Sequence, residues 1–416
     1  MLDREPQPGR CAARFLITVQ LRGVLRLASL EYIDFKPLRE VIENDSIRWE
    51  PDKLARAVPR LPQLFWQEGE SWAEANYWAL DRASHPQADI ETVKALMKHL
   101  HAYAQFLEDT GLDWRHFPMR LADRAVVRFR GHLVEQLNRG SLASSTARAR
   151  MAAVIQFYRH AEAHGFVGAE SSLWKERAVV IPYHDAAGFK RAMGRVTTDL
   201  AIPNRRRPGA VLEDGLTPLR TEYMEQLLAF SSKEGPQELN LMLLTGFFTG
   251  ARIETITTLG IGNLEQAHPD PFMKGFWLLR VGPGTGVATK LNVEGDLLVP
   301  EFLLDELKAY AYSTKRLLRE RKASPEHRST LFLTMHGKPY GQASVTRLMT
   351  DLRRTALVAG LKFMERFKFH QTRATYGTWL MQLALSATSE ANAVALVKNA
   401  MLHKNEATTF RYIRFL

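Results

Sequence analysis

Three stripes of apolar residues, all between residues 89 and 165, restrict the fold of this chain more than any other feature. The first stripe recurs at steps of three or four residues through Val93, Leu96, Met97, Leu100, Tyr103 and Leu107. Two further stripes run over residues 126–137 and 151–158, and the three are followed by Gly111, Gly140 and Gly165. Amphipathic helices bury one face in this way, and glycine is common just after a helix. The sequence therefore predicts a compact helical bundle over residues 81–170.

The segments on either side of the bundle are less regular. Residues 1–80 contain several prolines and aromatic residues such as Trp66 and Trp72 without a dependable period, and are predicted to be an N-terminal extension of unknown role. Over residues 171–214 the helical period fades into a stretch rich in Pro, Gly and Arg, which predicts a basic inter-domain linker. A second domain is predicted over residues 215–416.

The second domain combines helical patterns with short strand patterns. Residues 239–259 form an apolar, mostly helical segment. Glycine-rich or polar turns separate three short apolar runs, at residues 276–281, 287–291 and 297–299. Helical patterns then resume over residues 302–318, 345–358 and 374–385. We therefore expect a mainly helical architecture with one small antiparallel sheet.

Composition favours a soluble protein with an anionic partner. The 416 residues are 45% hydrophobic, and 56 Lys and Arg against 45 Asp and Glu give a net charge of +11. The single cysteine, Cys11, excludes an internal disulfide framework and fits a reducing compartment. The most membrane-like stretch, residues 15–30, is short and is interrupted by Arg22 and Arg26. A cytoplasmic, nucleoid-associated protein without membrane contact is therefore expected.

Two groups of arginines are candidates for DNA contact. Arg148 and Arg150 fall in the first turns of a helix predicted to open at Ser144-Ser145-Thr146, where backbone N–H groups also attract phosphate. The run Arg205-Arg206-Arg207 lies in the predicted linker, which could follow a duplex. The alternative for each of these arginines is ordinary solvated surface charge.

Two further arginines stand in unusual surroundings. Arg252 lies inside the apolar segment 246–259, and Arg373 closes the tetrapeptide His370-Gln371-Thr372-Arg373. A buried guanidinium needs an anionic partner, and its paired donors match two oxygens of a phosphodiester. The alternative is a structural ion pair with Glu254 or another carboxylate.

These arginines belong to an ordered set of motifs that resembles the tyrosine recombinase, or phage integrase, family. The set consists of Thr249-Gly250-Ala251-Arg252 with Leu259, then His370-x-x-Arg373, then His403 and Tyr412 nine residues later. Lys290, in Ala288-Thr289-Lys290, resembles the family's sheet lysine, which sits on a hairpin turn. It is preferred to Lys274, which precedes the first predicted strand. The resemblance spans about residues 85–416.

The resemblance implies both a fold and a chemistry. The fold is a helical core-binding bundle of SAM-like type followed by a mixed α/β catalytic domain. The chemistry is site-specific cleavage and rejoining of DNA strands through a 3′-phosphotyrosine, without ATP, a metal ion or another cofactor. The biological outcome would be integration, excision or transposition of a mobile element. Implied partners are double-stranded DNA, further copies of the chain as a tetramer on paired sites, and accessory recombinases or DNA-bending proteins.

The resemblance also assigns roles to the motif residues. Tyr412 attacks the phosphorus, His370 accepts its proton, and His403 binds or helps to position a non-bridging phosphate oxygen. Lys290 donates a proton to the leaving 5′-oxygen. A phenol of reference pKa about 10 is a weak nucleophile at neutral pH, so such help is required, and each proton transfer is typically worth about 10² to 10⁴ in rate. Arg252 and Arg373 would stabilise the phosphorane.

The sequence departs from the family pattern at three points. Thr255 stands where members often have an acidic residue, Leu402 stands where Gly is common, and four residues follow Tyr412. The support of Arg252 and the entry to His403 are therefore expected to differ. Two other functions are compatible with the fold: strand relaxation resembling that of a type IB topoisomerase, and DNA binding by a catalytically silent architectural protein.

Overall fold

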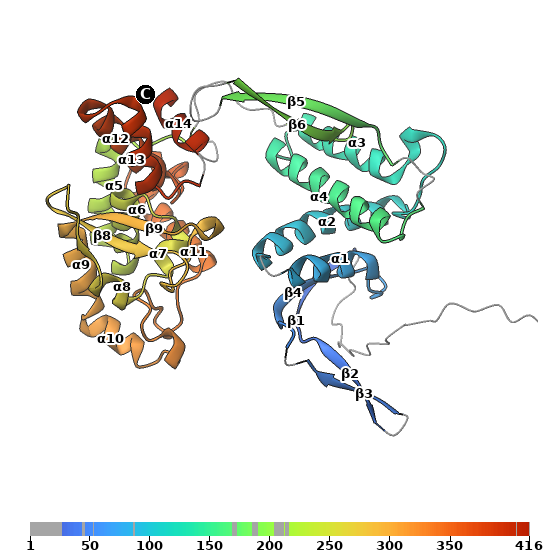
Figure 1. Ribbon diagram of the computed structural model, residues 1–416, viewed down its shortest axis with the longest axis horizontal. Coiled ribbons are helices and arrows are strands. Elements are labelled where there is room, and N and C mark those ends of the chain that lie inside the picture. The colour runs from blue at the N-terminus through green and yellow to red at the C-terminus, as the bar shows by residue number, and fades with distance from the viewer. Residues whose placement is uncertain are drawn as a thin grey trace, which may run out of the picture. The chain divides into compact units, whose positions relative to one another are not determined.

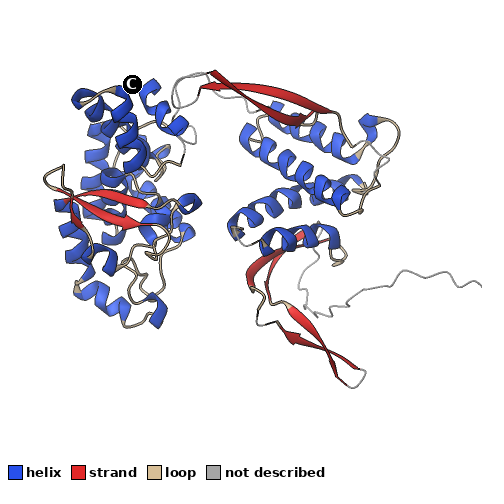
Figure 2. Cartoon of the chain, viewed as in Figure 1, coloured by secondary structure: helices blue, strands red, loops and turns tan. Residues whose placement is uncertain are grey.

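The computed structural model describes residues 27–43, 46–52, 54–85, 88–168, 173–184, 190–203, 212, 216–404 and 406–415 (Figure 1). The chain divides into two compact units, of which the first holds the described residues up to 203 and the second those from 212 onward. Helices dominate both units, and the described sheets have two or three strands each (Figure 2). The expected fold class, a helical bundle followed by a mixed unit with a small antiparallel sheet, is confirmed.

The first unit begins with strands and continues with helices. Its elements are β1 (Ser29–Phe35), β2 (Leu38–Glu43), β3 (Ser46–Pro51), β4 (Val58–Phe65), α1 (Ala73–Ser84), α2 (Ile90–Thr110), η1 (Leu121–Asp123), α3 (Ala125–Asn138), α4 (Ser144–Ala163), β5 (Glu176–His184) and β6 (Lys190–Thr198). The three apolar stripes are helices α2, α3 and α4, and Gly111 ends α2 in the left-handed conformation with φ 62°. Helix α4 begins at Ser144 as expected, and Ala143 occupies its N-cap position without a side-chain hydrogen bond.

The strands and α1 share one core with the bundle. Trp72, 1% exposed, lies at the aromatic centre of this core, where the rings of Trp66, Phe157 and Trp114 lie 4.6, 5.1 and 5.9 Å from its own. Buried residues of β4 and of α1 complete the same cluster. The boundary expected at residue 80 therefore falls inside α1, and the described part of the segment expected to be an extension packs into the bundle.

Two hairpins of this unit were not predicted from the sequence. Strands β2 and β3 form an antiparallel ribbon on which Ile42 and Ile47 pair and are 70% and 59% exposed. Strands β5 and β6 pair over nine positions within the stretch expected to be a linker. Arg205, Arg206 and Arg207 lie outside the described residues.

The second unit surrounds a three-stranded antiparallel sheet with helices. Its elements are α5 (Thr221–Glu234), α6 (Gln237–Thr249), α7 (Ile253–Thr257), α8 (Ile261–Glu265), β7 (His268–Pro269), β8 (Phe276–Val281), η3 (Lys290–Asn292), β9 (Gly295–Pro300), α9 (Glu301–Ala311), α10 (Thr314–Glu320), η4 (Pro325–His327), α11 (Gln342–Val358), η5 (Lys362–Glu365), α12 (Gln371–Ala387), α13 (Glu390–Ala400) and α14 (Glu406–Phe415). The sheet order is β7-β8-β9.

Two of the three expected strands are confirmed as β8 and β9. The third, at residues 287–291, is wrong: Val287 forms one isolated bridge with Gly282, and the chain then enters η3. Leu291 and Asn292 take positive φ values of 61° and 53°, which turn the backbone out of the sheet. The third strand is instead the short β7.

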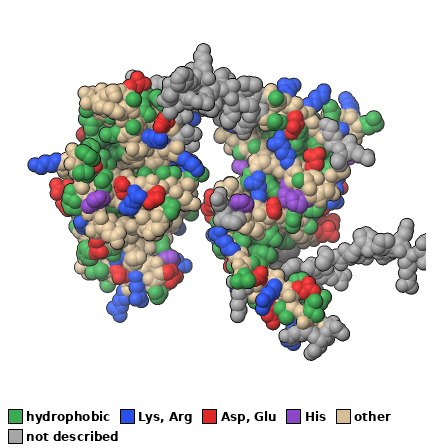
Figure 3. All heavy atoms as spheres, viewed as in Figure 1, with side chains coloured by type: hydrophobic (Ala, Val, Ile, Leu, Met, Phe, Trp, Pro, Cys, Tyr) green, Lys and Arg blue, Asp and Glu red, His purple; other side chains and the backbone are tan. Residues whose placement is uncertain are grey.

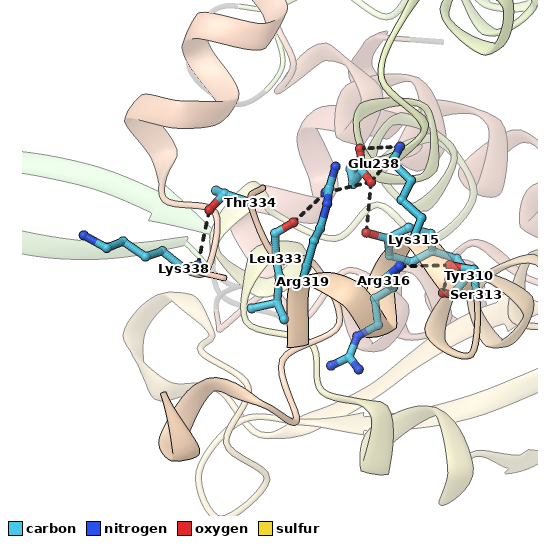
Figure 4. Close-up of polar contacts among 9 residues, drawn as sticks. All are labelled: Glu238, Tyr310, Ser313, Lys315, Arg316, Arg319, Leu333, Thr334 and Lys338. Atoms are coloured by element: carbon cyan, nitrogen blue, oxygen red, sulfur yellow. Dashed lines mark hydrogen bonds and ion pairs between the residues drawn. The ribbon is translucent and has the colours of Figure 1, made fainter. Parts of the chain in front are cut away.

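The expected helix over residues 302–318 is two helices, α9 and α10. Ser313 separates them, because its side chain accepts a hydrogen bond from Arg316 N and so caps α10. Figure 4 shows how α10 is tied to α6: the fully buried carboxylate of Glu238 lies 2.7 Å from Arg319 and 3.0 Å from Lys315. Tyr310 donates a hydrogen bond to the same carboxylate. Removing a charged partner of this carboxylate would be costly.

The second unit has two hydrophobic cores. One gathers side chains of α6, the sheet, α9 and α11, and the other gathers side chains of α12, α13 and α14. Met401 belongs to the second core, whereas its neighbour Leu402 packs against the first. The end of α13 is therefore the place where the two cores meet. Among the described helices, none has an apolar stretch long enough to cross a bilayer.

Candidate active site

The first motif lies where α6 ends and α7 begins. Gly250 ends α6 with φ 65°, and a β-carbon there would lie 2.4 Å from Tyr376 Cδ1, so the close approach to α12 requires glycine. Arg252 follows at the N-cap of α7. It is partly exposed, in contrast to the burial expected from its apolar neighbours, because the chain turns between the two helices. Thr255, which replaces the family's acidic residue, is 3% exposed.

Arg373 connects α12 to the ends of two other helices of the site. It lies in the first turn of α12, is 2% exposed, and donates hydrogen bonds of 2.7 Å to the carbonyl oxygens of Gly250 and Met401. Those carbonyls belong to the C-cap residues of α6 and α13, where helix dipoles place partial negative charge. This arrangement gives the buried cation favourable surroundings, and it fastens the segments that lead to Arg252 and His403 to α12.

His403 is positioned by the way α13 ends. Its N–H donates to Lys398 O at 2.9 Å, and the N–H of Leu402 donates to Asn399 O at 3.0 Å. These are the two bonds of a Schellman motif, whose left-handed position usually holds glycine and here holds Leu402, with φ 52°. The side chain of His403 is 5% exposed, and its Nδ1 lies 2.8 Å from Thr409 Oγ1 of α14.

Tyr412 lies beside His403, on α14. Its side chain is fully buried, and its ring stacks on that of His403 with 6.0 Å between centroids. A β-carbon at Gly377 would lie 2.5 Å from Tyr412 Cε1, so the tyrosine packs directly on the backbone of α12, one turn beyond Arg373. The structure thus brings together Arg373 of α12, His403 just after α13, and Tyr412 of α14.

His370 and Lys290 are the remaining two members of the predicted catalytic set. His370 is the N-cap residue of α12 and is partly exposed, three residues before Arg373. Lys290 is exposed at the start of η3, in the connection between β8 and β9. The distances that join these two side chains to a phosphate depend on DNA, so their catalytic roles stay predictions.

The expectation that Lys274 precedes the first strand is wrong. Because β7 precedes β8, Lys274 also lies in a connection between strands. Strand register now distinguishes them: the β8–β9 connection leaves from the pair Val281↔Gly295, and Gly295 contacts Leu402 next to His403. Lys274 lies at the other end of β8, beside the pair Phe276↔Pro300. The register therefore favours Lys290.

The candidate DNA-contacting arginines of α4 differ in their surroundings. Arg148 is exposed, whereas Arg150 is half-buried and burial lowers its pKa. Burial also lowers the pKa of His99, with a smaller contribution from the charge of Arg150. On the face shown in Figure 3, basic side chains are interspersed with acidic ones over each unit. Net charge alone therefore does not mark a DNA-binding surface.

The fold, a helical bundle followed by a mixed unit with a small antiparallel sheet, is that of solved tyrosine recombinases. One solved structure of that fold is a lambda integrase dimer bound to a core site, with TM-score 0.50 and 13% identity over 82% of this chain and 94% of that chain. Another is the Tn1549 transposon integrase with circular intermediate DNA, with TM-score 0.50 and 15% identity over the same shares. No protein-family model and no curated protein matches the sequence. At these identities the likeness shows the fold.

Two residues of the site were not singled out from the sequence. Gly377 carried a usable signal, because glycine inside an otherwise apolar helix indicates close approach of another element. Thr409 carried none, since a threonine six residues after His403 belongs to no recognisable pattern. Its contact with His403 exists only because α14 folds back on α13.

Proposed function

We propose that this protein is a site-specific DNA recombinase that cleaves and rejoins DNA strands through Tyr412. The observation that carries the proposal is the convergence of Arg373, His403 and Tyr412, from three sequence motifs, on one buried cluster. The fold shared with two DNA-bound integrases supports it. We also infer double-stranded DNA as the partner, further copies of the chain on paired sites, and a role in moving a mobile element.

The proposed reaction exchanges one phosphoester bond for another. The Tyr412 oxygen forms a bond to phosphorus while the bond from phosphorus to the 5′-oxygen breaks. The phenol proton passes to His370, and the 5′-oxygen takes a proton from Lys290. A 5′-hydroxyl from a partner strand then attacks the 3′-phosphotyrosine in the reverse sense, so no external energy source enters the balance.

Arginine provides the electrostatic part of the mechanism. Hydrogen bonds to the two carbonyls hold Arg373 in a fixed orientation before DNA arrives, and preorganised donors of this kind stabilise charge that develops in a transition state. Arg252, partly exposed beside Gly250, would supply the second guanidinium. Both would face the non-bridging oxygens of the phosphorane.

The burial of Tyr412 favours a second candidate function. A fully buried tyrosine is also what a packing role produces, so a DNA-binding protein without turnover is the alternative. Under the proposed function, α14 must shift so that the hydroxyl can reach a phosphate. The two candidates differ in one measurable product, which is a covalent bond between Tyr412 and DNA.

The deciding experiment uses nicked suicide duplexes that span candidate sites flanking the gene. We expect a covalent protein–DNA complex in a denaturing gel, with the DNA attached to Tyr412 on peptide mapping. Tyr412→Phe removes one hydroxyl and is expected to abolish the complex while duplex binding persists. A complex that survives in Tyr412→Phe, or DNA attached at another residue, would refute the assignment.

A further inference from the structure

Leu402 holds a backbone conformation that ordinarily belongs to glycine. With φ 52° it occupies the left-handed position of the motif that ends α13. A non-glycine residue in this conformation is energetically costly, because its β-carbon crowds the following carbonyl oxygen. Glycine would avoid that cost, so the leucine side chain must contribute something that glycine cannot.

The side chain contacts Gly295, the first residue of β9. A β-carbon at Gly295 would lie 2.5 Å from Leu402 Cδ2, so the leucine methyl group rests directly on the strand backbone. Helix α13 also packs against β9. Leu402 is partly buried in the core that contains the sheet, whereas Met401 belongs to the core of α12, α13 and α14. Leu402 therefore joins the two cores.

The contact links two parts of the proposed catalytic machinery. On one side, the carbonyl of Met401 accepts a hydrogen bond from Arg373, and His403 follows Leu402 directly. On the other side, Gly295 closes the β8–β9 connection that carries Lys290. Within that connection Leu291 is 67% exposed, but Ala288 N–H donates to Thr258 Oγ1 and Thr289 Oγ1 donates to Val293 O, so the contact at Gly295 is one of several that place the turn carrying Lys290.

We propose that Leu402 is a positioning residue for Lys290, which it keeps beside the Arg373–His403 cluster by packing on Gly295. This inference rests on the proposed function, because it assigns the contact a role in delivering a proton from Lys290 to the leaving 5′-oxygen. Loss of the leucine side chain would leave the fold of α12 intact and loosen the β8–β9 connection.

The proton transfer can be tested separately from the rest of the reaction. When sulfur replaces the bridging 5′-oxygen, the bond from phosphorus to sulfur breaks and the thiolate leaves without a proton, since thiols have a pKa of about 8.5. A variant that misplaces only Lys290 should cleave this substrate well. A variant that misplaces Arg373, His403 or Tyr412 should fail on both substrates.

The experiment compares Leu402→Ala and Leu402→Gly with wild type. The alanine variant keeps the left-handed strain and the glycine variant relieves it, but both lose the contact with Gly295. Leu396→Ala is the control, because Leu396 lies on α13, the helix that precedes Leu402, and is 38% exposed. Hydrogen exchange of residues 286–296 reports on the connection without DNA. Suicide-duplex cleavage is measured with oxygen and with sulfur at the bridging position.

We expect both Leu402 variants to lose exchange protection in residues 286–296, while α12 keeps its protection. Cleavage of the oxygen substrate should fall by about 10-fold or more, toward the loss in Lys290→Ala, and cleavage of the sulfur substrate should stay near wild type. Unchanged exchange, equal losses on both substrates, or a Leu402→Gly variant as active as wild type would each overturn the proposal. If wild type cleaves neither substrate, the proposed function fails, and exchange alone then decides whether Leu402 holds the connection.

Discussion

Tyr412 lies against Gly377, and a β-carbon at that glycine would come within 2.5 Å of the tyrosine ring. The same β-carbon would lie 2.5 Å from the sulfur of Met401, whose carbonyl accepts a hydrogen bond from Arg373. The absence of one side chain on α12 thus lets the end of α13 and helix α14 approach α12 together. This packing places the candidate nucleophile beside the candidate phosphate-binding arginine.

Gly377→Ala should therefore destabilise the second unit. Overpacking of a filled core typically costs about 1–3 kcal/mol. Gly131→Ala on α3 is the control, because a β-carbon there meets nothing within 4 Å and alanine should stabilise a helix by about 0.5–1 kcal/mol. Urea denaturation of both variants measures the difference. Equal stability of Gly377→Ala and wild type would contradict the direct contact.

The two arginines of the site should respond differently to substitution. Arg373→Lys cannot bond both carbonyls with the geometry of a guanidinium, so we expect it to lose about 1–3 kcal/mol of unfolding free energy together with DNA cleavage. Arg252→Ala should lose cleavage at nearly unchanged stability, because Arg252 is partly exposed. Denaturation and suicide-duplex cleavage, measured on the same samples, distinguish the two effects. Near-normal cleavage by either variant would exclude that arginine from the active site.

The core of the first unit contains a buried chain of hydroxyl groups. Tyr158 donates to Trp114 O at 2.6 Å, and because its one proton is used there, the 2.6 Å bond between the two hydroxyls has Tyr103 as donor. Tyr158→Phe leaves the Tyr103 hydroxyl without an acceptor and the Trp114 carbonyl without a donor, and each should cost about 1–3 kcal/mol of unfolding free energy. Tyr103→Phe should cost about 1 kcal/mol. Thermal or chemical denaturation shows which of the two variants is less stable. A larger loss in Tyr103→Phe would refute the assigned direction of the bonds.

The same pair predicts how stability changes at alkaline pH. Burial raises the pKa of Tyr103 and raises that of Tyr158 well above the ordinary value near 10. The folded state keeps these protons at pH values where the unfolded chain loses them. Their contribution to stability is therefore complete below pH of about 10 and decreases above it, by up to about 1.4 kcal/mol per pH unit for each proton. Urea titrations of the double Phe variant should show a smaller alkaline loss than wild type. An identical loss would exclude the pair as its source.

The sequence predicted those features that depend on local pattern. The stripe ending at Leu107 predicted α2, and Gly111 after it ends the helix as expected. The burial of Arg373 was also anticipated from its motif. Features set by tertiary contact were not predictable: the strand alternation of β4 is broken at Arg60, where φ is 53°, so its buried residues show no period of two.

The same limit applied within the site. Arg252 has apolar neighbours in sequence, but the turn after Gly250 brings it toward solvent. Leu402 adopts a conformation that its residue type disfavours, because packing on Gly295 offsets the local preference. Strand β7 has two residues, which are too few to form a recognisable strand pattern in the sequence. Lys274, which follows β7, was therefore predicted to lie outside the sheet. For Leu402 the decisive partner, Gly295, is remote in sequence.

Because α14 packs on α12 and α13, the phenol of Tyr412 is buried in the resting protein. Under the proposed function, transient sliding along genomic duplex would then leave every phosphodiester untouched. Strand breakage would require the energy of a cognate complex to extract α14, so fidelity would be set by a conformational gate as well as by base recognition.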